Sequence, residues 1–368
     1  MSDQPFQFEP EAYEALLRDK AARVYGRFEP LQVPEPEIFA SPPSAFRMRA
    51  EFRMWHDGDA LDYVMFRRGE PRTPVKITGF PIACEAIQQL MPKLKDHLVA
   101  DDELRRKLFQ VEFLSTLAGD TLVSLIYHRP LDERWEQRSG DLAESLGITI
   151  VGRSRKQKLV VGSDYVTECL DIAGKSYRYR QYEQAFTQPN AKVNIHMIEW
   201  ALGASAALSD DLLELYCGNG NFTLPLASQF DNVIATELSK TSTRAAQHNL
   251  SDNDVTNVQM IRLAAEEVSQ ALTGVRPFRR LAVLPKPLQD YALNTVFVDP
   301  PRAGLDDNTV AMLRGFNNLI YISCNPETLA SNCESLSDTH RITRFAMFDQ
   351  FPYTDHMECG AMLERISA

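Results

Sequence analysis

The sequence predicts an α/β protein with an N-terminal α+β region and a C-terminal, doubly wound sheet of seven strands. The chain has 368 residues, which is enough for two or three domains. Its 44% hydrophobic and 24% charged residues are typical of a folded globular protein. From about residue 187, short apolar strands alternate with helical stretches, as in a sheet covered by helices on both faces. We therefore expect one region over residues 1–186 and a second over residues 187–368.

The first region reads as α+β because strand-like runs and helical stretches are mixed without regular alternation. Hydrophobic periodicity predicts helices at residues 9–27, 82–99 and 132–146. Strands are expected at residues 45–55, 61–67, 110–117, 121–128 and 148–152.

The second region contains seven apolar runs of strand length. They lie at residues 211–217, 232–238, 258–263, 294–299, 318–324, 342–348 and 358–364. The last two runs are joined by a loop too short for a crossover helix, so we expect them to pair antiparallel.

Composition excludes several classes of protein. No apolar run approaches the roughly 18 residues that a membrane span needs, and five acidic residues among the first 20 disfavour a secretory signal, so we expect a cytoplasmic protein. The six cysteines are far apart and form no CxxC pair, which predicts free thiols and no metal or iron–sulfur site. A net charge of −11 argues against indiscriminate binding to polyanions, although a local basic patch can still collect phosphates.

Basic residues between Arg47 and Lys76 are interleaved with aromatic residues between Phe46 and Phe66, and residues 151–180 carry an excess of basic residues. An RNA-facing sheet needs this combination, with cations for phosphates and rings for unstacked bases. A solvated strand face whose aromatic residues lie in the core gives the same pattern and is the commoner case. The pattern alone leaves both interpretations open.

A glycine-containing turn follows the first strand of the second region. Gly218 and Gly220 would let the backbone approach a ligand, but the third glycine of the dinucleotide fingerprint is absent. Glu237 ends the next strand, where its carboxylate can accept hydrogen bonds from both hydroxyls of a ribose. An acidic residue before a GxG turn and a second acid at the end of the next strand fit S-adenosylmethionine (SAM). The alternative is that the glycines only form an ordinary tight turn.

The fourth strand ends in Asp299-Pro300-Pro301-Arg302, at the sheet edge where ligands of such folds bind. In enzymes that methylate amino groups, a similar motif ends in an aromatic residue that stacks on the target base. Arg302 at this position argues against an exocyclic amine as the methyl acceptor. Without the neighbouring motifs, two prolines would indicate only a rigid turn.

Cys324 ends the fifth strand and precedes an expected helix with Asn325 as N-cap and Pro326 as its first residue. A helix N-terminus favours the thiolate, which is the nucleophilic form, although a lone cysteine is more often a small buried hydrophobe. Glu358 opens the last strand, where apolar neighbours would raise its pKa and suit it to accept a proton. A salt bridge or a loop cap is the ordinary role of such a glutamate.

A thiol, a carboxylate and a methyl donor together suggest methylation of carbon 5 of uracil. This carbon is a poor nucleophile until a thiolate adds to carbon 6 and makes the ring electron-rich. A base must then remove the proton on carbon 5 before the thiol is expelled. Cys324 and Glu358 would fill these two roles.

Four runs, at residues 213–222, 297–302, 322–328 and 356–359, resemble those of the RNA 5-methyluridine methyltransferases. Residues 46–52, 186–190 and 348–352 look like the branch that methylates uridine 54 in the T-loop of tRNA. The resemblance implies a Rossmann-like, SAM-dependent methyltransferase domain at 187–368 and an RNA-recognition region at 1–186. It implies tRNA as the partner through its T-arm, tmRNA as a further candidate substrate, and no obligate protein partner.

The resemblance also assigns roles to individual residues. It matches Cys324 to the nucleophile and Glu358 to the base. The expected cofactor contacts are Gln188, which rests on resemblance alone, with Tyr216, Gly218, Gly220, Asn221, Glu237 and Asp299. The candidates for RNA contact are Arg49, Arg53, Phe109 and His128.

Three other interpretations remain. The ribosomal-RNA branch is the nearest one, but the chain lacks the clustered cysteines of some of its members and obvious room for an oligonucleotide-binding module before residue 45. A nicotinamide-dependent dehydrogenase would leave Cys324 and Glu358 without a role. A tRNA-folding factor with a methyltransferase scaffold would bind tRNA without transferring a methyl group.

Overall fold

The computed structural model describes residues 5–67, 69–70 and 73–366, and the chain forms two compact units. The first unit comprises the chain up to Glu11, Pro42–Cys169 and Arg180–Ala191. The second comprises Ala12–Ser41, Leu170–Tyr179 and the chain from Lys192 onward. The boundary expected at residues 186/187 falls inside the last segment of the first unit.

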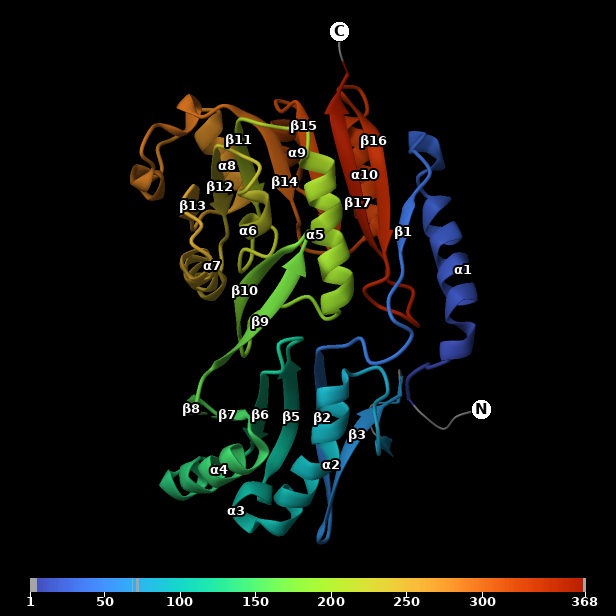
Figure 1. Cartoon of the computed structure of the whole chain (residues 1–368), viewed down its shortest axis with the longest axis vertical. Helices are drawn as coiled ribbons and strands as arrows, with labels where there is room; N and C mark the ends of the chain where they lie inside the picture. The colour runs from blue at the N-terminus through green and yellow to red at the C-terminus, as the bar shows by residue number, and fades with distance from the viewer. Residues whose placement is uncertain (1–4, 68, 71–72, 367–368) are drawn as a thin grey trace. The chain divides into compact units, whose positions relative to one another are not determined.

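The first unit is built on a sheet of seven strands in the order β4-β3-β2-β5-β6-β7-β8 (Figure 1). The strands are β2 (Arg49–Asp57), β3 (Ala60–Phe66), β4 (Pro74–Lys76), β5 (Leu108–Ser115), β6 (Thr121–Tyr127), β7 (Thr149–Ser154) and β8 (Gln157–Val161). Neighbours are antiparallel except β6 and β7, which are parallel because helix α4 (Glu133–Leu146) connects them.

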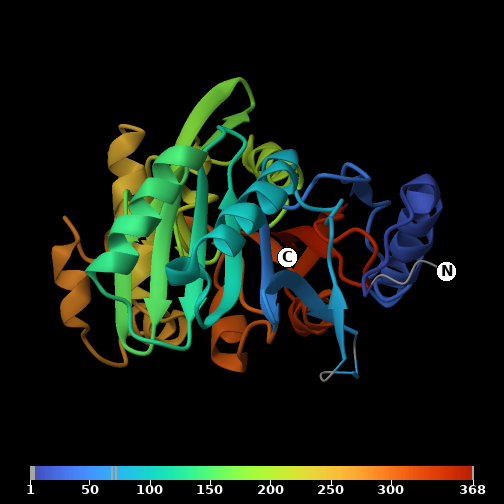
Figure 2. The same ribbon diagram turned by 90° about the horizontal axis from the view of Figure 1, so that it is seen from below.

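Helices α2 (Glu85–Ala100) and α4 pack on this sheet, and the short α3 (Asp102–Arg105) lies between them in sequence (Figure 2). The Asp132 side chain caps α4 by accepting a hydrogen bond from the Trp135 N–H, and Gly147 ends the helix with a φ of 65°. The indole of Trp135 is fully buried. It lies so close to Gly152 on β7 that an added Cβ would be 2.1 Å from the ring, so this position requires glycine.

The second unit is built on a sheet in the order β1-β16-β17-β15-β14-β11-β12-β13. Its strands are β1 (Glu37–Phe39), β11 (Asp211–Leu215), β12 (Asn232–Thr236), β13 (Val258–Ile261), β14 (Leu293–Val298), β15 (Asn318–Ser323), β16 (His340–Phe348) and β17 (Glu358–Arg365). The seven expected strands are present, and the antiparallel pairing of the last two is confirmed. The expected count of seven was wrong by one, because β1 adds an eighth strand parallel to β16. A run of three residues is too short to show a strand period.

Helices cover both faces of this second sheet (Figure 1). They are α1 (Tyr13–Tyr25), α5 (Ala191–Ser205), α6 (Thr223–Leu226), α7 (Lys240–Asp252), α8 (Ala265–Leu272), α9 (Asp307–Leu313) and α10 (Pro326–Leu336). One apolar cluster joins α1, α8, α9 and α10 to one face of the sheet. On the other face, the Trp200 ring of α5 packs against Gly360 of β17.

Helix α1 lies beside the edge strand β1 in Figure 1, and Ala21 and Val24 of the helix, with the following Phe28, join the core of the second unit. The helix therefore belongs to the second unit, although it lies within the first 186 residues of the chain.

The remaining ordered elements are short. Strands β9 (Tyr165–Ile172) and β10 (Lys175–Tyr182) form a separate two-stranded sheet. Four short 3₁₀ helices occur at Pro10–Ala12, Glu29–Leu31, Arg279–Val283 and Leu288–Asp290.

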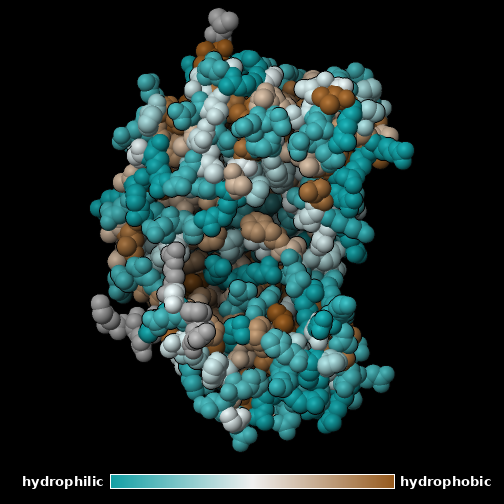
Figure 3. Space-filling model, turned by 180° about the vertical axis from the view of Figure 1, so that it is seen from behind, coloured by the Kyte–Doolittle hydropathy of each residue, from teal (hydrophilic) through white to brown (hydrophobic). Residues whose placement is uncertain are grey.

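The face seen in the space-filling view is mainly hydrophilic, and the hydrophobic residues on it are scattered rather than gathered in one large patch (Figure 3). Of the helices described, none combines the length and the apolar character that crossing a bilayer requires. All six cysteines carry free thiols.

Candidate active site

The turn after β11 has the backbone geometry of a ligand-binding loop. Tyr216, Gly218 and Gly220 all have positive φ values, of 59°, 58° and 85°. A side chain on Gly218 would meet nothing within 4 Å, whereas a Cβ on Gly220 would lie 2.8 Å from the Leu224 side chain. Gly220 is thus needed for close packing, and Gly218 leaves its surroundings open. A non-glycine residue such as Tyr216 in this conformation is strained, as is common at binding sites.

Two side chains brace this loop. The Glu237 carboxylate accepts hydrogen bonds from the Gly218 N–H at 3.1 Å and the Ser239 N–H at 2.6 Å, which joins the ends of β11 and β12. Each of its oxygens keeps a second lone pair that can accept a ribose hydroxyl. The Asn221 side-chain amide exchanges two hydrogen bonds of 2.8 Å with Asn194 on α5.

The Glu214 carboxyl group on β11 is completely buried, and neither oxygen has a hydrogen-bond partner within the described residues. The Thr223 hydroxyl is also unpaired, although it lies near enough to oppose part of the rise in the Glu214 pKa. Burial is the main cause that raises this pKa to about 8, and the negative charge of Asp299 adds to it. An uncompensated buried carboxyl group is what a cationic ligand would satisfy, so the site fits a sulfonium or ammonium group such as SAM carries.

Cys324 lies between the end of β15 and the start of α10, as expected. The Asn325 side chain caps α10 by accepting a hydrogen bond from the Glu327 N–H at 3.1 Å. However, burial, Glu358 and Asp299 raise the pKa of the Cys324 thiol to about 11, while Arg302 lowers it. The expectation of a thiolate favoured by the helix N-terminus is therefore wrong for the protein without ligands, because burial and two carboxyl groups outweigh that effect.

Strand pairing brings Glu358 beside Cys324. Strands β15 and β17 are antiparallel, with Ser323 opposite Cys359. Cys324, which follows Ser323, and Glu358, which precedes Cys359, therefore reach the same edge of the sheet. Asp299 reaches this edge from the end of β14, which is parallel to β15. Glu358 is 4% exposed, and burial, followed by the charge of Asp299, raises its pKa well above the ordinary value, which confirms the expected direction.

A pocket of about 470 Å³ opens around Cys324. Its lining residues are Arg23, Val24, Arg27, Arg302, Cys324, Asn325, Pro326, Glu327, Asp355 and His356. The Arg302 guanidinium donates a hydrogen bond of 3.2 Å to His356 Nδ1, and the Arg302 carbonyl accepts one from the Asn325 side chain. Arg302 therefore contributes a positive charge near the thiol.

Three of the four candidates for RNA contact form one stack on the sheet of the first unit. The rings of Phe109 and His128 are 4.0 Å apart and nearly parallel, and the Arg53 guanidinium lies 3.5 Å from the centre of the Phe109 ring. Arg53 and His128 are exposed, and Phe109 is partly exposed. We call these three residues the stacking platform.

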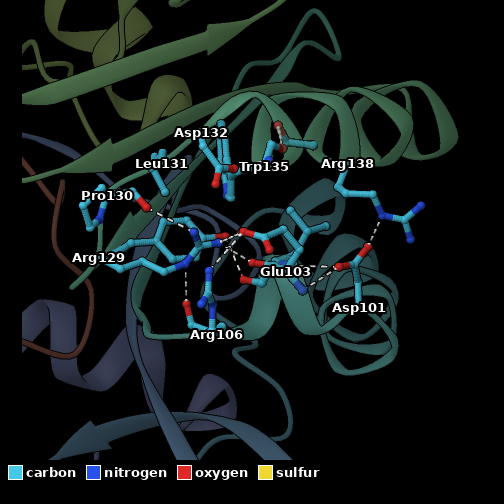
Figure 4. Close-up of polar contacts among 12 residues, drawn as sticks. Asp101, Glu103, Arg106, Arg129, Pro130, Leu131, Asp132, Trp135 and Arg138 are labelled. Carbon is cyan, nitrogen blue, oxygen red and sulfur yellow. Dashed lines mark hydrogen bonds and ion pairs between the residues drawn. The ribbon is translucent and has the colours of Figure 1, made fainter.

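A polar network around Arg129 and Glu103 lies next to the platform along the chain (Figure 4). The nearly buried Arg129, which follows His128, forms an ion pair with Glu103 and donates a hydrogen bond of 3.0 Å to the Arg106 carbonyl. The His128 N–H in turn donates to the Lys107 carbonyl. These bonds join the ends of β5 and β6, where Phe109 and His128 lie.

The fourth candidate for RNA contact, Arg49, and the cofactor candidate Gln188 have different surroundings. Arg49 donates hydrogen bonds to the Glu183 and Ala185 carbonyls at 2.7 and 2.9 Å and pairs with Glu112 at 3.8 Å, so its guanidinium already holds neighbouring backbone in place. Gln188 lies in the Arg180–Ala191 segment of the first unit. Its role as a cofactor contact stays a prediction.

Three residues of the site were not among the expected ones. They are Glu214, which lies near Asp299, and Arg23 and Arg27, which line the pocket around Cys324. An acid inside the apolar run Asp-Leu-Leu-Glu-Leu is the signal that points to Glu214. No sequence signal points to the two arginines, because nearly 300 residues separate them from Cys324. Among the residues that the structure describes, no three His, Cys, Asp or Glu side chains gather as metal ligands would.

Comparison with known proteins gives consistent matches. The family described as tRNA (Uracil-5-)-methyltransferase matches residues 12–366. The chain is 56% identical over 361 residues to the tRNA/tmRNA (uracil-C(5))-methyltransferase of Pseudomonas paraeruginosa, covering 98% of this chain and 99% of the relative. It is 55% identical over 358 residues to the protein of the same name from Pseudomonas putida, covering 97% and 99%.

A solved structure shares the fold. The Pyrococcus abyssi tRNA (uracil-54, C5)-methyltransferase, solved with S-adenosyl-L-homocysteine, matches with a TM-score of 0.71 at 21% identity, covering 95% of this chain and 83% of the other. This match covers nearly the whole chain and supports the expected α/β fold class. Together with the family match, it leads to one conclusion: the chain belongs to the tRNA (uracil-5-)-methyltransferase family.

Proposed function

We propose that this protein transfers a methyl group from SAM to carbon 5 of uridine 54 in the T-loop of tRNA, which gives 5-methyluridine. The observation that carries the proposal is the meeting of Cys324 and Glu358 at one sheet edge, beside Asp299 and the glycine loop. The relatives named tRNA/tmRNA (uracil-C(5))-methyltransferase make tmRNA a second candidate substrate. A cytoplasmic location and the T-arm as the bound part of tRNA belong to the same proposal.

In this proposal the side chains around the glycine loop hold the cofactor. Glu237 accepts hydrogen bonds from the ribose, Gly218 and Gly220 give access to the backbone, and the carboxyl groups of Glu214 and Asp299 face its positive charge. The remaining expected contacts are Gln188, Tyr216 and Asn221. When bound, SAM supplies a methyl group on a positively charged sulfur.

Cys324 and Glu358 then act on the uracil in turn. The Cys324 sulfur bonds to carbon 6, which makes carbon 5 nucleophilic, and carbon 5 takes the methyl group. Glu358 removes the proton from carbon 5, and the ring expels the Cys324 sulfur as its double bond reforms. Because the Cys324 pKa is about 11 without ligands, the thiolate needs added positive charge, and Arg302 already contributes in that direction.

The first unit supplies RNA recognition in this proposal, and the second supplies catalysis. The target uridine must leave its stack to reach Cys324, at a cost of about a few kcal/mol. The stacking platform offers an aromatic surface and a guanidinium to bases exposed by this step.

Methyl transfer to defined RNAs tests the proposal. The full chain is incubated with methyl-labelled SAM and an unmodified tRNA transcript, and nucleosides are separated after digestion. Label is expected in 5-methyluridine, and a matched transcript with cytidine in place of uridine 54 should stay unlabelled. Label only in ribosomal RNA would favour the ribosomal branch, and tRNA binding without any label would favour a folding factor.

Analysis of cellular tRNA gives an independent test. In a strain that lacks this protein, the proposal expects tRNA without 5-methyluridine at position 54. Unchanged 5-methyluridine at that position would contradict the proposed substrate.

A further inference from the structure

We propose that Arg23, at the end of α1, and Arg27, in the turn after this helix, bind the phosphodiester backbone of the substrate RNA beside the Cys324 pocket. In the protein without RNA, Asp355 and Glu327 occupy these two guanidinium groups, and the RNA phosphates displace the two carboxylates. This inference rests on the proposed function, because it names the residues that would bind the substrate RNA at the proposed active site.

The position of the two arginines is the first observation. Both line the pocket that contains Cys324, together with Arg302. The uracil ring carries no charge, so the reaction at carbon 5 does not itself call for three guanidinium groups. The phosphates are the charged part of a nucleotide, and arginine binds phosphate with paired hydrogen bonds. The pocket thus gathers three arginines, although Asp355 and Glu327 also line it.

The geometry of α1 is the second observation. Arg23 lies in the last turn of α1, and Arg27 lies in the turn that follows the helix, where its N–H donates a hydrogen bond to the Val24 carbonyl. Ala21 and Val24 of this helix pack in the core of the second unit. Both arginines therefore lie next to residues buried in this core, Val24 and Phe28, and can contact neighbouring phosphates of one strand.

The ion pairs of these arginines are the third observation. Arg23 lies 3.0 Å from Asp355, and the two side chains are 57% and 91% exposed. Arg27 forms an ion pair with Glu327, and these side chains are 44% and 68% exposed. Pairs this exposed add little stability, so a phosphate can replace the carboxylate at little cost. The two acids would also repel RNA that does not bring a phosphate to these positions.

Steady-state kinetics with two double variants tests the inference. Arg23→Ala with Arg27→Ala should raise the KM for tRNA about tenfold or more, with kcat and the KM for SAM little changed. The slope of log KM against log salt should fall by about two, one for each lost phosphate contact. Arg18→Ala is the matched control, because this exposed arginine lies on α1 outside the pocket.

The second double variant predicts the opposite sign. Asp355→Asn with Glu327→Gln removes the competing carboxylates, so the KM for tRNA should fall several-fold at low salt. A merely structural role for the ion pairs would predict that both double variants weaken the protein in the same way. Thermal unfolding of each variant separates loss of fold from loss of binding.

The outcomes distinguish this inference from the proposed function. If the wild-type protein puts no label on carbon 5 of uridine, the proposed function fails, whatever the arginines do. If the wild-type protein is active but the arginine variant keeps the wild-type KM and salt slope, the phosphate contacts are overturned. An increase in KM for the variant without carboxylates would overturn the displacement.

Discussion

At the scale of single residues, four ionisable side chains of the second unit influence one another's pKa values. They are Glu214, Asp299, Cys324 and Glu358. Burial raises the pKa of each one, to about 8 for Glu214, about 7 for Asp299 and about 11 for the Cys324 thiol. At neutral pH the protein without ligands thus keeps the Cys324 thiol protonated, and burial shifts the three acids towards their protonated forms. In the proposed reaction these groups act only when ligands are bound: the cofactor brings a positive charge, and the uracil brings the proton that is removed.

The thiol is the first of these groups to test. Cys324→Ala should abolish turnover, because the residues that line the pocket include no second cysteine to add to carbon 6, and it should leave SAM binding nearly unchanged when measured by calorimetry. Cys169→Ala is the matched control, since this partly exposed cysteine lies in the first unit, and it should keep full activity. Turnover that survives in Cys324→Ala would remove the covalent mechanism.

Glu358→Gln should separate the two halves of the reaction. The amide cannot accept the proton from carbon 5, so addition and methyl transfer should proceed while elimination stops. A covalent complex of protein and methylated RNA should accumulate and be visible on denaturing gels and by mass spectrometry. If no such complex forms while turnover is lost, Glu358 has a role other than the base.

The buried Glu214 carboxyl group makes stability depend on pH. Its pKa in the folded protein, about 8, is above the ordinary value of 4.5. Stability from this group is therefore complete below about pH 4.5 and is lost as the pH rises through about 8, on the order of a few kcal/mol. In the ligand-free protein, Glu214→Gln should reduce the fall in Tm between pH 6 and pH 9, whereas the exposed Glu136→Gln should leave it unchanged. Equal falls in the wild-type and Glu214→Gln proteins would contradict this assignment.

At the scale of elements, the apolar strands of the second unit were predictable because parallel strands buried on both faces are hydrophobic along their length. All five residues of β11 are buried, for example. Strands β8, β9 and β10 were not predicted, because polar and charged residues alternate with the apolar ones and all three strands remain partly exposed. Strand β1 has three residues, too few to show the alternation of apolar and polar residues that predicts a strand.

The candidate site was predictable only in part. The motifs identified Cys324 and Glu358, but their meeting depends on β17 lying between β15 and β16, which the pairing of distant segments decides. The raised pKa of the thiol depends on the same arrangement, because Glu358 and Asp299 contribute to it. Such long-range pairings leave no trace in local residue patterns.

The loop between β16 and β17 carries Glu358 at its end, and Lys20 of α1 holds it in place. The buried Lys20 ammonium donates hydrogen bonds to the Asp349 carboxylate at 2.5 Å and to the Phe351 and His356 carbonyls at 3.1 and 3.0 Å. The Tyr13 hydroxyl donates to the same carboxylate at 2.8 Å. Helix α1 thereby fixes both ends of the loop that precedes the proposed base.

Removal of this ammonium group should be costly. Lys20→Met leaves the Asp349 charge buried without its partner, which should lower the free energy of unfolding by about 3–5 kcal/mol in urea titrations. Lys192→Met, an exposed lysine on α5, should change it by less than about 0.5 kcal/mol. A small effect of Lys20→Met would mean that the Asp349 carboxylate is rehydrated or protonated in the variant.

At the scale of the whole molecule, two compact units carry different chemistry. The second unit holds the ionisable groups around Cys324, and the first unit presents the stacking platform on an antiparallel part of its sheet, where β2, β5 and the end of β6 meet. A net charge of −11 means that general attraction to RNA is weak, so specific contacts must supply the affinity. Stacking on splayed bases suits this requirement, because it depends little on salt compared with phosphate contacts.

Substitution of the platform should therefore affect tRNA and not the cofactor. Phe109→Ala removes the central ring between Arg53 and His128, and a lost base stack of about 1–3 kcal/mol corresponds to a rise in the KM for tRNA of about five- to 150-fold. The KM for SAM and the salt slope should stay as in the wild type, which distinguishes this variant from the loss of phosphate contacts. Leu117→Ala, an exposed apolar residue of the same unit, should leave the KM for tRNA unchanged. An unchanged KM in Phe109→Ala would mean that the stack serves only to pack the sheet, and the first unit would then need another surface to recognise RNA.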